Sequence, residues 1–189
     1  MSGHGGHIDA SNKRVALVIA VLAAALAFSE TLGKSAQTAA LSYNVEASNL
    51  WSFFQAKTIR MTTLRTAGEA LELDLAREQN ARAKEAMEKR IAEWRKTAAR
   101  YESEPETQEG RKELVARAKG AEKKRDMSLA AYHHYELSSA ALQLAIVLAT
   151  ANIITGVAFL LWGSLGLRVA GVVFILIGFL APTSVHLFY

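Results

Sequence analysis

The run Leu137–Trp162, LSSAALQLAIVLATANIITGVAFLLW, decides the fold because it contains no charged residue. An α-helix rises about 1.5 Å per residue, so about 20 apolar residues cross the hydrocarbon core of a bilayer. Two further runs are also long and apolar. They are Val15–Leu32, VALVIAVLAAALAFSETL, whose one charged residue is Glu30 near its end, and Val169–Leu187, VAGVVFILIGFLAPTSVHL. The sequence therefore predicts an all-α integral membrane protein with transmembrane helices at residues 13–33, 137–162 and 169–189.

The segments that flank these helices are polar or rich in glycine. The linker GSLGLR at residues 163–168 contains two glycines, which predicts a tight turn and an antiparallel pair of membrane helices. The glycine-rich residues 1–12 predict a disordered tail. A signal peptide is the alternative reading of the first run, since Lys13 and Arg14 precede it. However, no clear cleavage site follows it.

Small residues recur at helix-packing intervals in all three apolar runs. Lipid is as apolar as leucine, so membrane helices associate through close approach of their backbones rather than through hydrophobic burial. The recurring positions are Ala16, Ala20 and Ala24 in the first run, Ala141, Ala145 and Ala149 in the second, and Gly171 and Gly178 in the third. Together they predict helix association within or between chains.

The segment Lys34–Glu136 carries nearly all of the charge. It contains 19 Lys or Arg against 16 Asp or Glu, and this balance argues against a nucleic-acid partner, which needs an unopposed positive surface. The chain has no cysteine, which excludes disulfides, thiolate catalysis and cysteine-ligated metals. It also lacks recognisable catalytic, phosphate-binding and metal-binding motifs. We therefore expect no enzymatic activity, no metal and no cofactor.

Residues 69–136 predict a charged antiparallel helical hairpin outside the membrane. Ala76–Arg100 is rich in Ala, Glu, Lys and Arg, which are strong helix formers. The stretch ESEPETQEG at residues 102–110 contains Pro105 and Gly110 and is the expected turn. A coiled-coil seam is predicted from side chains that recur at spacings of four and three. These are Met87, Ile91, Trp94, Ala98 and Tyr101.

The two limbs of this hairpin have unequal lengths. As one helix, residues 34–101 extend roughly 100 Å, whereas the return limb at 106–136 extends roughly 46 Å. The excess falls at residues 34–68, between Gly33 and Gly68 as hinges. We expect this segment to lie on the membrane or to pack against a neighbouring subunit. Its candidate interfacial side chains are Trp51, Phe53 and Phe54.

A polar cluster marks the end of the first apolar run. Glu30 and Lys34 lie one helical turn apart, and charges at membrane depth are costly and often functional. An ion pair at the membrane edge, with the side chains reaching water, is one expectation. An ion pathway or a subunit contact is the other, with Glu30, Lys34, Ser35 and Thr38 as the candidate pore or intersubunit residues.

A second polar cluster precedes the second apolar run. His133 and His134 lie within the stretch YHHYE, which resembles the aromatic belt at a membrane interface. Adjacent helical positions point about 100° apart, so the two imidazoles do not easily bind one metal ion. We take both histidines as candidate interfacial residues.

The stretch Asn44–Arg60, NVEASNLWSFFQAKTIR, is the most specific part of a wider resemblance. From Asn12 to Ala67 the chain resembles bacterial membrane proteins of the domain-of-unknown-function 4337 family, and the resemblance extends more loosely over the rest of the sequence. It implies a bacterial inner-membrane protein of this topology. It implies no activity and supplies no catalytic residues.

Three thin membrane helices with a coiled-coil seam favour a homo-oligomer in the lipid bilayer. The leading hypothesis is a non-enzymatic assembly or scaffold whose arm makes protein contacts. The alternative is a homo-oligomeric pore or ion channel with the first membrane helix near the axis. Six basic residues near the arm-side ends, against three on the other side, favour a cytoplasmic arm. Lys13 and Arg14 before the first helix favour the opposite orientation.

Overall fold

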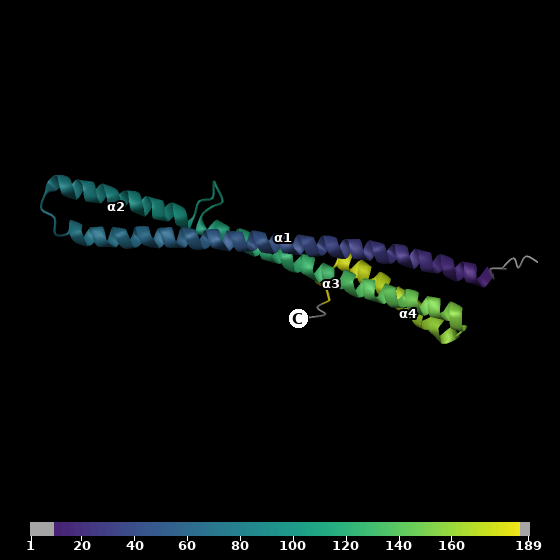
Figure 1. Ribbon diagram of the computed structural model, residues 1–189. Helices are drawn as coiled ribbons and strands as arrows, with labels where there is room; N and C mark the ends of the chain where they lie inside the picture. Colours follow the sequence, from purple (N-terminus) through teal and green to yellow (C-terminus); the bar gives the residue numbers. More distant parts are fainter. Residues whose placement is uncertain (1–9, 186–189) are drawn as a thin grey trace, which may run out of the picture. The chain divides into compact units, whose positions relative to one another are not determined.

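The computed structural model describes residues 10–185 and is all-α over that range, with four helices and no strand (Figure 1). The helices are α1 (Ala10–Leu75), α2 (Ala81–Glu102), α3 (Arg111–Thr155) and α4 (Ala158–Leu180). Three of them, α1, α3 and α4, are each long and apolar enough to cross a membrane. The chain divides into two compact units to which both α1 and α3 contribute. We call residues 42–124 the charged unit and the remainder the apolar unit.

In the charged unit the chain reverses at residues 76–80. The Asn80 side chain caps α2, because its Oδ1 atom accepts hydrogen bonds from the amides of Arg82 at 3.0 Å and Ala83 at 3.3 Å. Glu78 Oε1 accepts from the amides of Gln79 and Asn80, both at 2.8 Å. These bonds satisfy amides that a helix start would otherwise leave unpaired, so the reversal forms without glycine or proline.

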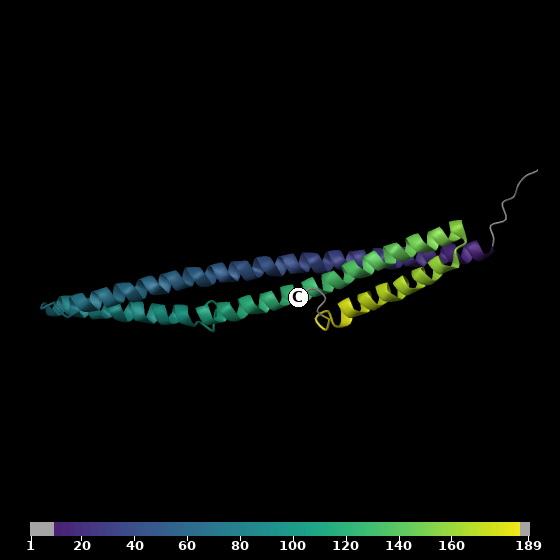
Figure 2. The same cartoon turned by 90° about the horizontal axis from the view of Figure 1, so that it is seen from below.

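After this reversal α2 lies alongside the C-terminal part of α1 (Figures 1 and 2). The ion pairs Arg95–Glu72 at 2.8 Å and Arg65–Glu102 at 3.9 Å show that the two helices are antiparallel. Each of the five residues assigned to the coiled-coil seam is buried or half-buried on α2, and Ile91 and Ala98 are the most buried. The face that carries the seam is therefore covered within this single chain.

Residues 103–110 connect α2 to α3 without reversing the chain. Gly110 allows the loop to close, because a Cβ atom there would overlap the Glu104 amide nitrogen and the Ser103 Cα. Beyond it, Trp51 Nε1 donates to Glu122 Oε1 at 2.9 Å, so α3 follows α2 along α1. The core of the unit lies between α1 and α3 and contains Ala47, Leu50, Leu114, Ala118 and Ala121.

Two of the boundaries predicted for this region are wrong. The arm expected at residues 69–136 does not turn at 102–110, because the reversal lies at 76–80. The segment 34–68 is not a separate interfacial helix, because α1 runs through it and through both expected hinge glycines without a break. The unequal limbs explain both errors. Once α2 is counted with the return limb, no excess length remains to be placed on the membrane.

In the apolar unit the tight turn between the last two membrane helices lies at Gly156 and Val157, not at residues 163–168. Gly156 has a φ of 70°, a conformation that favours glycine. Its amide donates to the Asn152 carbonyl at 2.9 Å, which is a common way to end a helix. The predicted linker is instead part of α4, and a Cβ atom on Gly163 would lie 3.2 Å from Leu148 of α3. The third helix of membrane-spanning length is therefore Ala158–Leu180 rather than 169–189.

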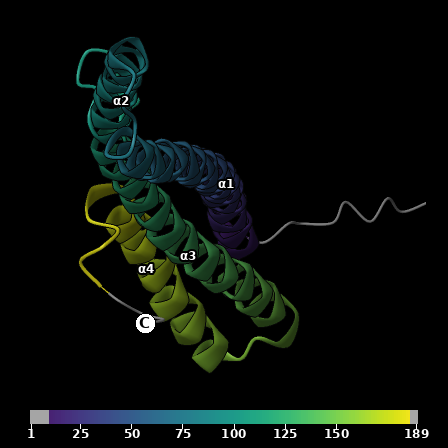
Figure 3. The ribbon, with the colours of Figure 1, turned by 90° about the vertical axis from the view of Figure 1, so that its left-hand side faces the viewer.

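Small residues allow α4 to pack closely beside α3 (Figures 2 and 3). A Cβ atom on Gly171 would lie 2.8 Å from Leu142 Cγ, and one on Gly178 would lie 3.0 Å from the Tyr135 ring. Ser164 Oγ donates to the Ala145 carbonyl at 2.8 Å. Leu142 and Ala145 also form one apolar cluster with Leu22 of α1.

The small-residue rows of the three helices differ in exposure. The row on α3 is buried, with Ala145 and Ala149 at 0% exposure. Gly171 and Gly178 on α4 are buried as well. The row on α1 is exposed at Ala16, Ala20 and Ala24. Close packing within the chain therefore uses the rows of α3 and α4, and it leaves the row of α1 open.

Candidate functional site

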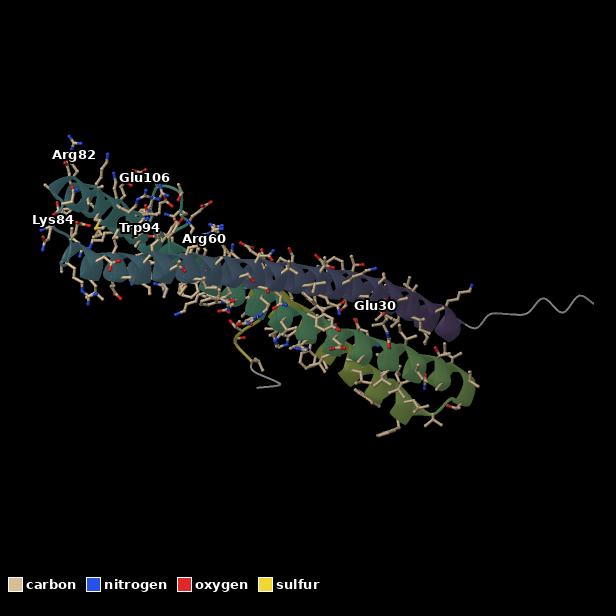
Figure 4. The ribbon with its side chains drawn as sticks, turned by 60° about the vertical axis from the view of Figure 1, so that its left-hand side comes forward. Glu30, Arg60, Arg82, Lys84, Trp94 and Glu106 are labelled. Atoms are coloured by element: carbon tan, nitrogen blue, oxygen red, sulfur yellow. The ribbon has the colours of Figure 1, made fainter. Side chains whose placement is uncertain are left out.

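The apolar unit contains a pocket of about 460 Å³ between α1 and α3. Most of the residues that line it carry a polar or charged group, and the aliphatic parts of their side chains contribute to its walls. From α1 they include Ser29, Glu30, Gly33, Lys34 and Gln37. From α3 they include Tyr132, Tyr135, Glu136, Ser139, Ala140 and Gln143. Figure 4 labels Glu30 where α1 faces α3.

Helical periodicity places these side chains in one pocket. Positions 30, 34 and 37 follow one face of α1, and positions 132, 136, 139 and 143 follow one face of α3. The two faces are held together beside the pocket by Ser29, which is fully buried. Its Oγ atom donates to the Tyr135 carbonyl at 3.0 Å. This bond fixes the register of the two helices.

The carboxylates of the pocket accept hydrogen bonds, whereas its cation makes no ion pair among the described residues. Gln143 Nε2 donates to Glu30 Oε1 at 3.2 Å, and the Tyr132 hydroxyl donates to Glu136 Oε1 at 3.4 Å. Lys34 lines the pocket, but no described carboxylate lies within ion-pair distance of its ammonium. The expected Glu30–Lys34 ion pair is therefore wrong for this structure, because Gln143 of the facing helix contacts Glu30 instead.

The four candidate pore residues do not share one surface. Glu30 and Lys34 line the pocket, whereas Ser35 and Thr38 are exposed on α1 outside it. The Thr38 hydroxyl donates to the Lys34 carbonyl at 2.9 Å, within its own helix. Sequence reasoning missed Gln37 and Ser139, and it named Tyr132 only as part of an interfacial aromatic stretch. Their spacing along each helix was a usable signal, but the register between α1 and α3 was not known.

The aromatic residues Trp51, Phe53 and Phe54 pack against the core of the charged unit. Trp51 and Phe54 meet edge to face with centroids 5.6 Å apart, and the Arg111 guanidinium lies 5.0 Å from the Phe54 centroid. Part of their apolar area is therefore buried inside the chain, where α3 packs against α1. Their assignment as membrane-interfacial or intersubunit residues stays a prediction.

A buried lysine stabilises the same region of the charged unit. Lys57 is 6% exposed, and its Nζ atom lies 3.8 Å from Glu104 and 3.9 Å from Glu109. It also lies 5.3 Å from the Phe53 centroid and 5.1 Å from the Tyr101 centroid. The two ion pairs therefore connect the loop between α2 and α3 to α1. The cation–π contact with Tyr101 connects α2 to α1.

The two candidate interfacial histidines have different surroundings. His134 is 2% exposed, stacks on Phe174 with centroids 6.2 Å apart and contacts the Pro182 carbonyl through Nε2 at 3.1 Å. It therefore contacts α4 and the segment after α4 rather than solvent. His133 is half-buried, with Nδ1 3.7 Å from Glu136 Oε2. The placement of both histidines at a membrane interface stays a prediction.

Comparison with known proteins adds a family but no activity. No curated protein and no solved structure matches the chain. The family model described as Domain of unknown function (DUF4337) matches residues 11–181. That match covers most of the chain, including every described residue of the pocket. The chain therefore belongs to the DUF4337 family.

Proposed function

We propose that the protein is a multi-pass protein of the bacterial inner membrane that assembles with copies of itself and serves as a non-enzymatic scaffold. In this proposal α1, α3 and α4 cross the bilayer, and the charged unit forms a helical hairpin outside it. The hairpin offers a charged surface for protein contacts. The division of the chain into an apolar and a charged unit supports this arrangement.

One observation carries the membrane assignment. In the most apolar stretches of α1 and α4, only 11% of the residues are buried within the chain, and in that of α3 only 28% are buried. Exposed residues such as Leu17, Ile154 and Phe159, at 68%, 79% and 79%, would form a large apolar surface in water. Patches of that kind mark a membrane or a protein interface.

Alkaline extraction of membranes from expressing cells tests the membrane assignment. We expect the protein to stay in the membrane pellet at high pH and to be released only by detergent, because apolar helices in a bilayer are not held by charge. A tagged peripheral membrane protein is the control that is released. Recovery of this protein in the alkaline supernatant would contradict the proposal.

The exposed row on α1 supports self-assembly. Ala16, Ala20 and Ala24 allow a second helix to approach closely, and no described residue of the chain covers them. Because the chain has no cysteine, the single variant Ala20→Cys should form disulfide-linked dimers in membranes under mild oxidation. The control is Val172→Cys, at a 48% exposed position of α4. Equal dimer yields from both variants would argue against an interface on α1.

The cytoplasmic orientation of the charged unit is part of the proposal and rests on the excess of basic residues near the arm-side helix ends. Single cysteines at Lys84 (Figure 4) and at Thr155, which ends α3, report on opposite sides of the membrane. We expect an impermeant maleimide applied to spheroplasts to label Thr155→Cys and not Lys84→Cys. The reverse pattern would place the charged unit in the periplasm.

A further inference from the structure

The pocket between α1 and α3 lies where the charge ends along both helices. Glu30 and Lys34 are the first charged residues after Arg14, and Glu136 is the last before Arg168. Gln143, at the other end of the pocket, lies within the uncharged run of α3. In the membrane arrangement proposed above, the pocket is therefore at the level of the phospholipid headgroups.

The charges of the pocket fit a ligand that carries both signs. Two carboxylates and one ammonium line it. An anionic ligand would be repelled by both carboxylates. A simple cation would leave Lys34 without a counterion. Among the described residues no group of three or more side chains is arranged to hold a metal ion. A neutral zwitterion with an ammonium and a phosphate satisfies all three groups.

We propose that this pocket binds the headgroup of a phospholipid with a primary ammonium and a phosphate, a phosphoethanolamine group. Glu30 and Glu136 accept hydrogen bonds from the ammonium, and Lys34 donates to the phosphate. Glu30 and Lys34 are one helical turn apart, about 6 Å along the axis, which suits the short ethanolamine linker. The inference rests on the proposed membrane insertion of the protein.

The acceptors of the pocket favour a primary over a quaternary ammonium. Carboxylate oxygens such as Glu30 Oε2, which accepts no hydrogen bond from the described residues, bind N–H donors, which a trimethylammonium group lacks. A quaternary ammonium is recognised instead by a cage of several aromatic rings. Here Tyr132 is a single ring at the rim, because Tyr135 is 5% exposed and packs against Gly178. The pocket therefore has acceptors and no cage.

An exposed apolar surface continues from the deep end of the pocket. Val147 lies one turn beyond Gln143 on the same face of α3 and is 60% exposed. Beside it Leu144 is 56% exposed. A headgroup in the pocket would lead its acyl chains onto this surface, which a soluble ligand would not use. This favours the lipid over free phosphoethanolamine as the source of the headgroup.

Native mass spectrometry of the detergent-purified full chain tests the site with dioleoyl lipids that carry ethanolamine, choline or glycerol headgroups. We expect the ethanolamine lipid to be retained about tenfold over the other two, the value of one charged hydrogen bond. The double variant Glu30→Gln with Glu136→Gln should lose the preference for ethanolamine over choline. Lys34→Gln should weaken retention of the ethanolamine and choline lipids equally, since both carry the phosphate.

The matched controls are Glu46→Gln and Lys119→Gln, which change exposed residues outside the pocket and should leave the preference unchanged. Equal retention of all three lipids, or an unchanged preference in the double carboxylate variant, would overturn the site. Full competition by soluble phosphoethanolamine would reassign it to a free ligand. Efficient dimer formation by Ser139→Cys without retained lipid would assign the pocket to a second copy of the chain.

The outcomes separate this site from the proposed function. If the unchanged protein resists alkaline extraction but shows no preference for the ethanolamine lipid, the proposed site is wrong and the membrane assignment stands. Release of the protein by alkali would remove the membrane assignment whatever the lipid result.

Discussion

The apolar and charged units bring helices together by different means. In the apolar unit α3 and α4 approach through glycine, and serine hydroxyls donate to the backbone carbonyls of the facing helix. In the charged unit α1 contacts α2 and α3 through aromatic rings, ion pairs and cations placed over those rings. In the proposed membrane arrangement this difference follows from the solvent of each unit. Burying leucine gains no hydrophobic free energy in lipid, so helices associate there through close approach of their backbones, whereas water favours burial of aromatic area.

Enlarging a contact glycine should have the largest effect. Gly171→Leu adds a side chain whose Cβ atom alone would lie 2.8 Å from Leu142 Cγ, and overpacking of this kind costs about 3 kcal/mol. We expect a clear loss of thermal stability in detergent, measured by circular dichroism. Gly166→Leu on the same helix is the control, because a Cβ atom there meets nothing within 4 Å. Equal losses would show that α4 does not pack on α3 through Gly171.

Removing the buried cation should have the next largest effect and should be confined to the charged unit. Lys57→Met removes the buried cation beside Glu104, which keeps only its ion pair with the exposed Arg100 at 3.6 Å, and we expect a loss of about 2 kcal/mol. The exposed pair of Arg95 with Glu72 is shorter, at 2.8 Å, yet Arg95→Met should cost about 0.5 kcal/mol because water screens it. Guanidinium unfolding followed by tryptophan fluorescence measures both. A larger loss of stability in Arg95→Met would show that the distance between the charges, rather than their burial, determines the strength of the ion pair.

The cap at the reversal should contribute less than the buried lysine. Asn80→Ala removes the acceptor for the amides of Arg82 and Ala83, and loss of such a cap costs about 1 kcal/mol. We expect faster hydrogen exchange at those two amides than in the unchanged protein. Gln79→Ala is the control, since no hydrogen bond to its side chain is present among the described residues of the turn. Similar exchange in both variants would mean that α2 starts without its cap.

The sequence was sufficient for the helical class and the three membrane-length helices, because a long run without charge has few other readings. It misplaced both reversals of the chain for the same physical reason. Gly163 and Gly166 are typical turn residues, but both lie inside α4, whereas Gly156 has the positive φ. The reversal at residues 76–80 is formed by Asn80 and Glu78 within a stretch of strong helix formers. Helix propensity alone therefore did not predict it.

Only part of the pocket could be predicted from the sequence. Glu30 and Lys34 stood out because charge is rare beside an apolar run. Gln143 could be assigned only once the bond between Ser29 and Tyr135 had fixed the register of α1 against α3. Antiparallel helices allow many registers at similar hydrophobic cost, and the observed register is the one that pairs the buried Ser29 hydroxyl with the Tyr135 carbonyl and packs Leu22 against Leu142.

The smallest expected effect is the pH dependence of the reversal in the charged unit. Hydrogen bonds from the amides of Asn80 and Gln79 lower the pKa of Glu78 below its ordinary value of 4.5. A carboxylate whose pKa is lowered by folding stabilises the folded state above its ordinary pKa, and this contribution is lost as the pH falls through the lowered value. Glu78→Gln keeps an oxygen acceptor but does not titrate, so it isolates the charge. We expect the unchanged protein to have the higher guanidinium midpoint at pH 7 and the two midpoints to converge at pH 3. A difference that stays constant with pH would show that the turn needs the acceptor and not its charge.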